Sequence, residues 1–301
     1  MLPAHKLIDG VTYSTSHRAD ILNSAKDICP RPSDIFICTY PKCGTTWIQH
    51  IVLQLLGKAE YDSPKANGEN CKTMGEISPF IEVRGKETVE KLPDPRVLKN
   101  HFDFRNIPKG GGAKYIYAVR NPKDCLTSYF HHYRNIKPLN FENGEFDVFF
   151  ELFMDGNVCY GDYFDHAQSW LNAIDKGKEN ILLLKYEDIT ADLKDAVLKI
   201  AHFLGGTAAE AIKVPGRLNE IINNSAFSSM KENQQRWVPP QIINAGRQFI
   251  RKGGSRDWKN HFTLEQSTRM DQKYATMTSG TEMEGWWKVE MYWESSDTRK
   301  G

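Results

Sequence analysis

The sequence lacks the features of a disulfide-stapled, metal-caged or membrane-spanning chain. Its six cysteines form no Cys-x-x-Cys pair, so they indicate neither a zinc cage nor a disulfide framework, and they fit a reducing compartment best. Apolar runs such as residues 51–56 are far shorter than a bilayer requires, and the amino-terminal residues lack the profile of a secretory signal. We therefore expect a cytoplasmic protein with no membrane partner.

An excess of charge of either sign is also missing. The 39 Lys and Arg residues nearly balance the 38 Asp and Glu residues, for a formal net charge of +1 at pH 7. This balance argues against a broad surface for nucleic acid, although it is compatible with a local basic pocket. Because the 301 residues are 40% hydrophobic and include no repeat or long linker, we expect a single domain over residues 1–301.

Three short, continuous apolar runs are typical of parallel strands buried on both faces, and they cover residues 35–40, 115–119 and 181–184. Apolar residues at helical spacing follow each run, with Pro122 placed to open the second helix and Gly205 to end the third. This order predicts an α/β fold, a single domain with a central, mostly parallel sheet flanked by helices.

Three polar, turn-rich stretches are long for connections in a compact domain. They cover residues 57–75, 137–147 and 223–258. We expect them to be functional loops around a pocket.

The strongest signal lies in residues 39–51, TYPKCGTTWIQHI, where a strand breaks at Pro41, turns through Gly44 and enters an amphipathic helix. The first N–H groups of a helix have no internal partners and its dipole is positive there, so this segment predicts an anion site. Lys precedes the single Gly, which differs from the nucleotide-triphosphatase loop. An ordinary capped strand-turn-helix is the alternative for this segment alone.

The segment TYPKCGTTW resembles the T-Y-P-K-S-G-T-T-W signature of the cytosolic sulfotransferases, with Cys43 in the Ser place. The segments VRNPKDCLTSY at 119–129 and RKGGSRDWKN at 251–260 are similar to two further elements of that family, in the same order. Weaker similarity extends the resemblance over nearly the whole chain, at residues 99–101, 160–166, 186–188 and 225–230.

The resemblance implies transfer of the sulfuryl group of 3′-phosphoadenosine 5′-phosphosulfate (PAPS) to the hydroxyl or amine of a small hydrophobic acceptor, with a phenol expected. It implies that the phosphosulfate lies on the backbone of the loop, that Arg and Ser side chains bind the 3′-phosphate, and that two aromatic rings enclose the adenine. The implied nucleotide-binding residues are Lys42, Cys43, Gly44, Thr45, Thr46, Trp47, Arg120, Ser128, Tyr186, Ser225, Phe227, Arg251, Lys252 and Gly253.

The resemblance also implies the catalytic roles. His101 would be the base, Lys42 would offset charge on the departing phosphate, and Lys99 would help to hold the sulfonate. Phe80, His101, His132 and Tyr160 would line the acceptor pocket. The family chemistry uses no metal, and the sequence gives no ligand set for one, because adjacent residues such as 131 and 132 face different sides of a helix.

The sequence departs from the family pattern at positions that carry further expectations. Cys43 stands at a helix N-terminus beside Lys42, so we expect a reactive thiol there. Arg256 replaces a Gly, and we expect its guanidinium to reach the nucleotide. The carboxy-terminal dimer element is altered at Thr268, so a monomer and a homodimer both stay open.

Two other interpretations stay open at this point. A nucleotide kinase or other phosphoryl transferase would share a strand-loop-helix anion site, although the sequence contains neither G-x-x-x-x-G-K-[ST] nor a kinase H-R-D and D-F-G set. The chain can also be a non-catalytic nucleotide-binding protein of the same fold, an alternative that the presence of Lys42 and His101 disfavours.

Overall fold

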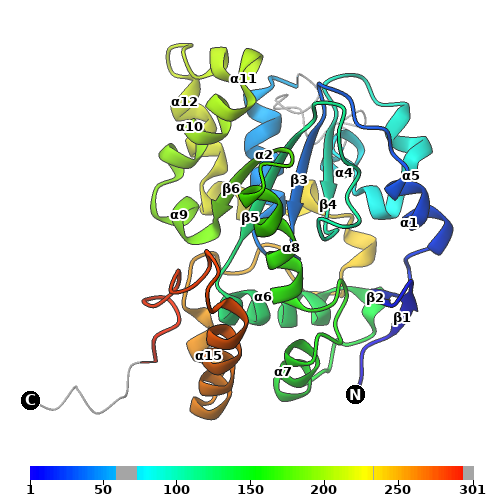
Figure 1. The fold of residues 1–301 in the computed structure, drawn as a ribbon, viewed down its shortest axis with the longest axis vertical. Coiled ribbons are helices and arrows are strands. Elements are labelled where there is room, and N and C mark those ends of the chain that lie inside the picture. The colour runs from blue at the N-terminus through cyan, green and yellow to red at the C-terminus, as the bar shows by residue number, and fades with distance from the viewer. Residues whose placement is uncertain (59–72, 233, 294–301) are drawn as a thin grey trace, which may run out of the picture.

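A computed structural model describes residues 1–58, 73–232 and 234–293, and its centre is a sheet of four parallel strands (Figure 1). The strand order is β4-β3-β5-β6, and each pair of neighbours is parallel. The strands are β3 (Ile35–Thr39), β4 (Val97–Asn100), β5 (Lys114–Val119) and β6 (Asn180–Lys185). The predicted α/β fold with a central, mostly parallel sheet is therefore confirmed.

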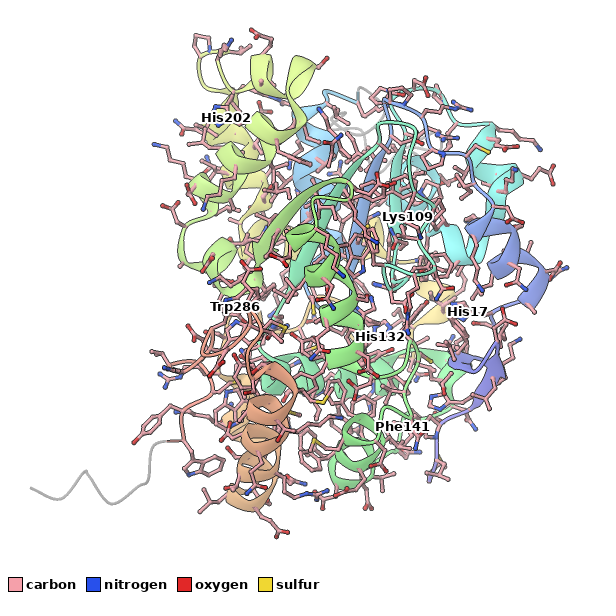
Figure 2. The ribbon with its side chains drawn as sticks, viewed as in Figure 1. His17, Lys109, His132, Phe141, His202 and Trp286 are labelled. Carbon is pink, nitrogen blue, oxygen red and sulfur yellow. The ribbon has the colours of Figure 1, made fainter. Side chains whose placement is uncertain are left out.

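Side chains of alternate strand residues enter two separate cores, because successive strand residues point to opposite faces. On one face, Phe36 and Tyr117 pack in a core that includes residues of α6 (Pro122–Asn135) and α8 (Tyr163–Asp175). On the other face, Ile37 packs with residues of α2 (Thr45–Leu55) and α10 (Leu193–Leu204). Figure 2 shows side chains on both sides of the sheet, with His132 near the centre of the molecule and His202 on the outer flank.

The predicted helix boundaries follow from local chemistry. Pro122 is the first residue of α6, and the Asn121 side chain caps that helix by accepting a hydrogen bond from the Asp124 N–H at 2.9 Å. Gly205 ends α10 with φ of 65°, a conformation that favours glycine. Both predicted boundaries are confirmed.

Further helices and 3₁₀ turns pack around the sheet and around the helices already named. They are α1 (Ala19–Lys26), α4 (Met74–Ile77), α5 (Ile81–Glu90), η1 (Lys137–Leu139), α7 (Phe146–Met154), α9 (Tyr186–Ala191), α11 (Gly206–Ala211), α12 (Arg217–Ser225), α13 (Phe227–Glu232), α14 (Gln234–Trp237), η2 (Pro240–Ile242), η3 (Asp257–Asn260) and α15 (Leu264–Thr278). None of the helices in the described part of the chain combines the length and apolarity that a membrane crossing requires.

An amino-terminal hairpin lies outside the main sheet and was not predicted from the sequence. Strands β1 (His5–Ile8) and β2 (Val11–Ser14) pair antiparallel through a two-residue turn. Asp9 and Gly10 of this turn have φ of 50° and 76°. An Asp-Gly pair between two strands is a common signal for such a turn, so the hairpin could have been predicted from these two residues.

The predicted long loops have a mixed outcome. Residues 59–72 of the stretch 57–75 lie outside the described residues. The stretch 137–147 contains only η1 before α7 begins. Much of 223–258 is not loop, since α13, α14 and η2 form short helical turns there, but residues of this stretch do line a cavity, as expected. That a single domain spans residues 1–301 stays a prediction.

Candidate active site

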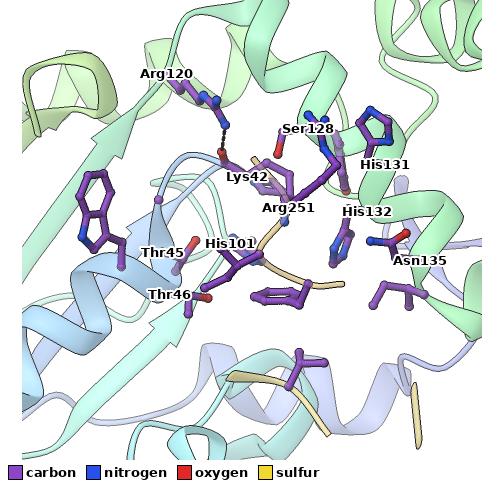
Figure 3. Close-up of a pocket in the computed structure, with 18 of the residues that line it drawn as sticks. Lys42, Thr45, Thr46, His101, Arg120, Ser128, His131, His132, Asn135 and Arg251 are labelled. Carbon is purple, nitrogen blue, oxygen red and sulfur yellow. Dashed lines mark hydrogen bonds between the residues drawn. The ribbon is translucent and has the colours of Figure 1, made fainter. Parts of the chain in front are cut away.

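The four parallel strands end at one edge of the sheet, and each is followed by a residue that the sequence assigns to the site. Lys42 follows β3, His101 follows β4, Arg120 follows β5 and Tyr186 follows β6. The strand order reverses at β3, and ligands of open α/β sheets bind in the crevice at such a point. These four residues line one cavity of about 650 Å³ (Figure 3).

The loop after β3 contains two residues with left-handed backbone. Lys42 has φ of 72° and Gly44 has φ of 98°. A Cβ atom at Gly44 would lie 3.2 Å from Cδ2 of Tyr186, so the close approach of this ring also favours glycine. Gly44 caps α2 without a side-chain hydrogen bond, which leaves the first N–H groups of the helix available to an anion.

Two half-buried ammonium groups lie over aromatic rings in this cavity. Lys42 Nζ is 4.7 Å from the centroid of the Phe249 ring, and Lys99 Nζ is 4.5 Å from that of Phe80. Burial lowers the pKa of Lys42 to about 7, with the charges of Lys99 and Arg120 adding to the effect, and burial lowers the pKa of Lys99 to about 8. An anionic ligand would supply the opposite charge that favours the ammonium form of both side chains.

His101 is held with one ring nitrogen turned away from the backbone. Its Nδ1–H donates to the Thr39 carbonyl oxygen at 2.8 Å, because a carbonyl can only accept. In the neutral imidazole, the lone pair is therefore on Nε2. Burial holds the pKa of His101 well below 6.5, and the charge of Lys99 adds to this, so the ring is neutral at pH 7. A neutral imidazole beside a cavity can accept a proton from a bound hydroxyl.

Glu82 of α5 positions His101 and was not found from the sequence. One Glu82 carboxyl oxygen accepts a hydrogen bond from the backbone N–H of His101 at 2.5 Å. The Glu82 side chain is fully buried, and burial raises its pKa to about 8. No local sequence pattern links these residues, since they come together only where α5 packs beside β4.

Arg120 is buried beneath the loops on either side of it. Its guanidinium lies 4.1 Å from the centroid of the Tyr186 ring and donates to the carbonyl oxygens of Lys42, at 3.3 Å, and Gly254, at 2.9 Å. Its Nε atom is buried without a hydrogen-bond partner among the described residues. A buried guanidinium with an unused donor fits an anionic ligand better than an apolar one.

Two further cationic side chains come from the carboxy-terminal loop and line the same cavity. Arg251 and Lys252 both pair with Asp257, the lysine at 2.6 Å from Oδ1. Ser128 of α6 lines the same cavity (Figure 3). The arrangement brings together two Arg side chains and a hydroxyl from segments more than a hundred residues apart, a set that suits a phosphate.

Trp47 and Phe227 line another part of the cavity. The Trp47 indole donates to the Ser225 carbonyl oxygen at 2.8 Å, and its ring centroid is 5.6 Å from that of Tyr186. Gly253 has φ of 63°, and a Cβ atom there would lie 2.3 Å from Cδ2 of Phe227. The loop can therefore approach this ring only with glycine at position 253.

Most of the predicted site residues line the cavity, and contact with a ligand stays a prediction for each of them. The residues that line it are Lys42, Gly44, Thr45, Thr46, Trp47, Phe80, Lys99, His101, Arg120, Ser128, His132, Tyr160, Tyr186, Phe227, Arg251, Lys252 and Gly253. Ser225 is corrected, because its hydroxyl is buried and accepts from Gln54 Nε2 at 3.0 Å. The expected backbone contact of Cys43 stays a prediction, and its side chain points into the core. Cys43 can meet a ligand only through its backbone.

The expectation of a reactive thiol at Cys43 is also wrong. The side chain is fully buried, and its Sγ atom lies 3.8 Å from Sγ of Cys125 and 3.9 Å from the Pro41 carbonyl oxygen. Burial raises the pKa of the thiol, an effect that outweighs the nearby helix N-terminus.

We therefore expect the native protein to resist alkylation at Cys43. Brief treatment with iodoacetamide should label the exposed Cys29 while leaving Cys43 and Cys125 unmodified, because only exposed thiolates react readily. Peptide mass spectrometry measures the modified fraction at each position. Labelling of Cys43 as fast as Cys29, without unfolding, would contradict the buried placement of its sulfur.

Aromatic rings line the part of the cavity beside His101. The ring of His101 lies between those of Phe80 and Tyr160, with centroid distances of 5.1 and 5.2 Å. His132 lines the same cavity. His17, which was not predicted, contacts the Tyr160 hydroxyl through Nε2 at 3.1 Å, and its buried Nδ1 has no hydrogen-bond partner among the described residues. This residue follows the amino-terminal hairpin that sequence analysis missed.

A metal-ligand set is also present outside the reacting centre. His131, Asp257 and His261 each bring one ligand atom into a cluster whose members lie within 4.8 Å of one another. This cluster was not predicted from the sequence, because position 131 is more than a hundred residues from positions 257 and 261.

Comparison with known proteins agrees with this geometry. Residues 32–286 match the Sulfotransferase domain family. Sulfotransferase 1C2 of Oryctolagus cuniculus is 36% identical over 271 residues, which cover 84% of this chain and 86% of the relative, and sulfotransferase 2A1 of Homo sapiens is 33% identical over 275 residues, covering 88% and 92%. The crystal structure of mouse sulfotransferase SULT7A1 complexed with PAP is similar with a TM-score of 0.73 and 28% identity, over 92% of this chain and 94% of that one.

The chain belongs to the sulfotransferase family, and it is an enzyme of sulfuryl transfer.

Proposed function

We propose that the enzyme transfers the sulfuryl group of PAPS to the hydroxyl of a small aromatic acceptor, with His101 as the base and Lys42 stabilising the departing phosphate. The convergence of Lys42, His101 and Arg120 at the carboxyl ends of three neighbouring strands carries the proposal. The anion-binding loop at Lys42, the neutral imidazole of His101 and the buried guanidinium of Arg120 therefore line the same cavity.

The proposed reaction requires the acceptor oxygen, the sulfur and the departing 5′-phosphate oxygen to lie in line. The acceptor oxygen forms a bond to sulfur, the bond between sulfur and the 5′-phosphate oxygen breaks, and the acceptor proton moves to Nε2 of His101. Negative charge that develops on the departing phosphate is stabilised by Lys42 and by the N–H groups at the start of α2. Lys99, beside the same cavity, helps to hold the sulfonate. The product nucleotide is PAP.

The acceptor class follows from the side chains around His101. Phe80 and Tyr160 flank the imidazole and favour a flat, apolar body, while His17 offers a buried ring nitrogen to a second polar group. These features support a phenol more than an aliphatic amine, whose charge would have to be desolvated beside Lys99.

A panel of phenols, sterols and amines incubated with PAPS tests the proposal. Mass spectrometry should detect a sulfonated product with at least one phenol, in equal amount to the PAP formed. ATP with Mg²⁺ should give no phosphorylated product. A phosphorylated acceptor would favour a kinase-like phosphoryl transferase, and tight PAP binding without any product would favour a non-catalytic nucleotide-binding protein.

We expect the affinity for PAP to fall as the pH rises above 7. An anion beside Lys42 favours its ammonium form, so the pKa of this group is higher in the complex than the value of about 7 in the free protein. Below pH 7 both states carry the proton, whereas above it binding takes up a proton and affinity falls by up to about tenfold per pH unit. Calorimetry in buffers of different ionisation enthalpy counts this proton.

Lys42→Arg is the matched variant for this test, because arginine keeps the charge and does not titrate in this range. Its affinity for PAP should change much less between pH 7 and 8. An equal pH dependence in both proteins would contradict the assignment to Lys42.

Arg256 does not take the place that the sequence predicts for it. Its guanidinium donates to the Val289 carbonyl oxygen at 3.2 Å, and its backbone N–H donates to Asp124 at 2.6 Å. The residue does not belong to the cavity lining, and its φ is 70°. The expectation of contact between its guanidinium and the nucleotide is therefore not supported by this placement.

Arg256→Gly should leave the affinity for PAP within about twofold of the parent, because the side chain is outside the cavity and glycine accepts the left-handed backbone. Calorimetry across a salt series measures both the affinity and its salt dependence. Affinity lower by tenfold or more, with a shallower salt slope, would restore the guanidinium contact.

A further inference from the structure

We propose that His131, Asp257 and His261 bind a divalent transition-metal ion of the zinc class. The site would join helix α6 to the segment 257–261, which follows the residues proposed to hold the 3′-phosphate. It does not take part in sulfuryl transfer, and its existence does not depend on the proposed function. The inference rests on where three side chains place their ligand atoms.

The two histidines have the separation of imidazoles that share a metal. Nε2 of His131 lies 3.3 Å from Nε2 of His261. With zinc–nitrogen bonds of about 2.0–2.1 Å and tetrahedral angles, two nitrogen ligands lie about 3.3–3.4 Å apart. A metal ion therefore fits between these atoms with little movement of either ring.

Packing restricts the orientation of both rings. The ring centroids of His131 and His261 are 4.9 Å apart at 75°, and Phe146 packs at 5.5 Å from the ring of His261. His131 is on α6, one turn after Ser128, and Figure 3 shows the two side chains at the same edge of the cavity. Ligands that are already oriented lose less conformational freedom on binding a metal.

Asp257 supplies the third ligand atom. Its Oδ2 lies 3.8 Å from Nε2 of His261, somewhat more than the tetrahedral separation, so a small shift of the carboxylate completes the set. Two histidines and one carboxylate are typical ligands for zinc and its borderline neighbours. Both Asp257 and His131 line the cavity, which leaves a fourth position for water.

The same carboxylate oxygen already pairs with Arg251, so the metal and Arg251 compete for Asp257. The guanidinium charge also repels a cation at this site. Removing that charge should therefore raise the affinity for the metal, by about fivefold for a like-charge interaction at a partly screened distance. The competition therefore predicts the direction in which the metal affinity changes when Arg251 is replaced.

Titration with Co²⁺ tests the site directly, because tetrahedral Co²⁺ has an intense visible spectrum and binds zinc-class ligand sets. The full chain, freed of metal by a chelator, should take up one Co²⁺ with this spectrum and release it to Zn²⁺. His131→Gln and His261→Gln should each weaken binding by at least about tenfold. His202→Gln, on the outer flank at α10, is the matched control and should bind as the parent does (Figure 2).

Arg251→Gln should bind Co²⁺ about fivefold more tightly than the parent. Circular dichroism of each variant establishes that it is folded. Absence of the tetrahedral spectrum in the parent, or an affinity of the histidine variants equal to that of the parent, would overturn the site. Unchanged affinity in Arg251→Gln would overturn the shared use of Asp257. If the protein binds PAP but no Co²⁺, the metal site is wrong and the proposed function stands. If it binds Co²⁺ but not PAP, the proposed function is wrong and the metal site stands.

Discussion

His101→Ala should lower the turnover of a phenol by about a hundredfold or more, the usual scale for losing a general base. The Nδ1–H of His101 is fixed on the Thr39 carbonyl oxygen, so the variant removes the Nε2 lone pair that would accept the acceptor proton. Affinity for PAP should stay within about twofold, because the imidazole is neutral and contributes no charge to anion binding. Steady-state kinetics and calorimetry measure the two effects separately.

The size of the expected effect depends on the acidity of the phenol that is used as the acceptor. A phenol that is still protonated at the assay pH needs the base, whereas a strongly acidic phenol is already ionised and should lose much less activity in His101→Ala. His202→Ala, an exposed histidine on α10, serves as the control. Full turnover by His101→Ala on the protonated phenol would remove His101 from the mechanism.

PAP should bind about 30- to 5,000-fold more tightly than adenosine 5′-monophosphate, which lacks only the 3′-phosphate. This range corresponds to about 2–5 kcal/mol, the scale for leaving buried charged groups without their partner. Arg120 supplies a buried guanidinium with an unused Nε, and Arg251 faces the same cavity. The discrimination should fall with rising salt, as expected for a charged contact that is partly exposed.

The variant Arg251→Gln tests whether Arg251 is responsible for the preference for PAP over adenosine 5′-monophosphate. The variant should lose most of its affinity for PAP and little of its affinity for adenosine 5′-monophosphate, so the two ligands form a double-mutant cycle. Arg18→Gln is the control, since Arg18 is exposed and pairs only with the exposed Asp20 among the described residues. Equal affinity of the parent protein for the two nucleotides would contradict the proposed 3′-phosphate site.

The sequence predicted best those parts of the site that lie in short segments. The loop of residues 39–47 combines a buried strand, a left-handed glycine and a helix start within a few positions, and local backbone chemistry determines its shape. The strands themselves were recognisable because both faces of β3 and β5 are apolar. Gly205 and Pro122 marked helix ends for equally local reasons.

Long-range packing determined the parts that were missed. Glu82 meets the backbone of His101 only because α5 packs beside β4, and His17 reaches Tyr160 only because the amino-terminal hairpin folds toward the cavity. Cys43 looked reactive from its neighbours in sequence, yet its sulfur faces Cys125, 82 positions away. Arg256 likewise turns toward Val289 instead of the cavity.

A crystal structure of the protein with PAP and a bound phenol tests the central claim most directly. The account predicts the 3′-phosphate within hydrogen-bond distance of Arg120, Ser128 and Arg251, and the phenol hydroxyl within that distance of Nε2 of His101. The 5′-phosphate should lie on the N–H groups at the start of α2, in line with the phenol oxygen. A nucleotide bound away from the loop at Lys42, or a phenol hydroxyl that does not face His101, would contradict the account.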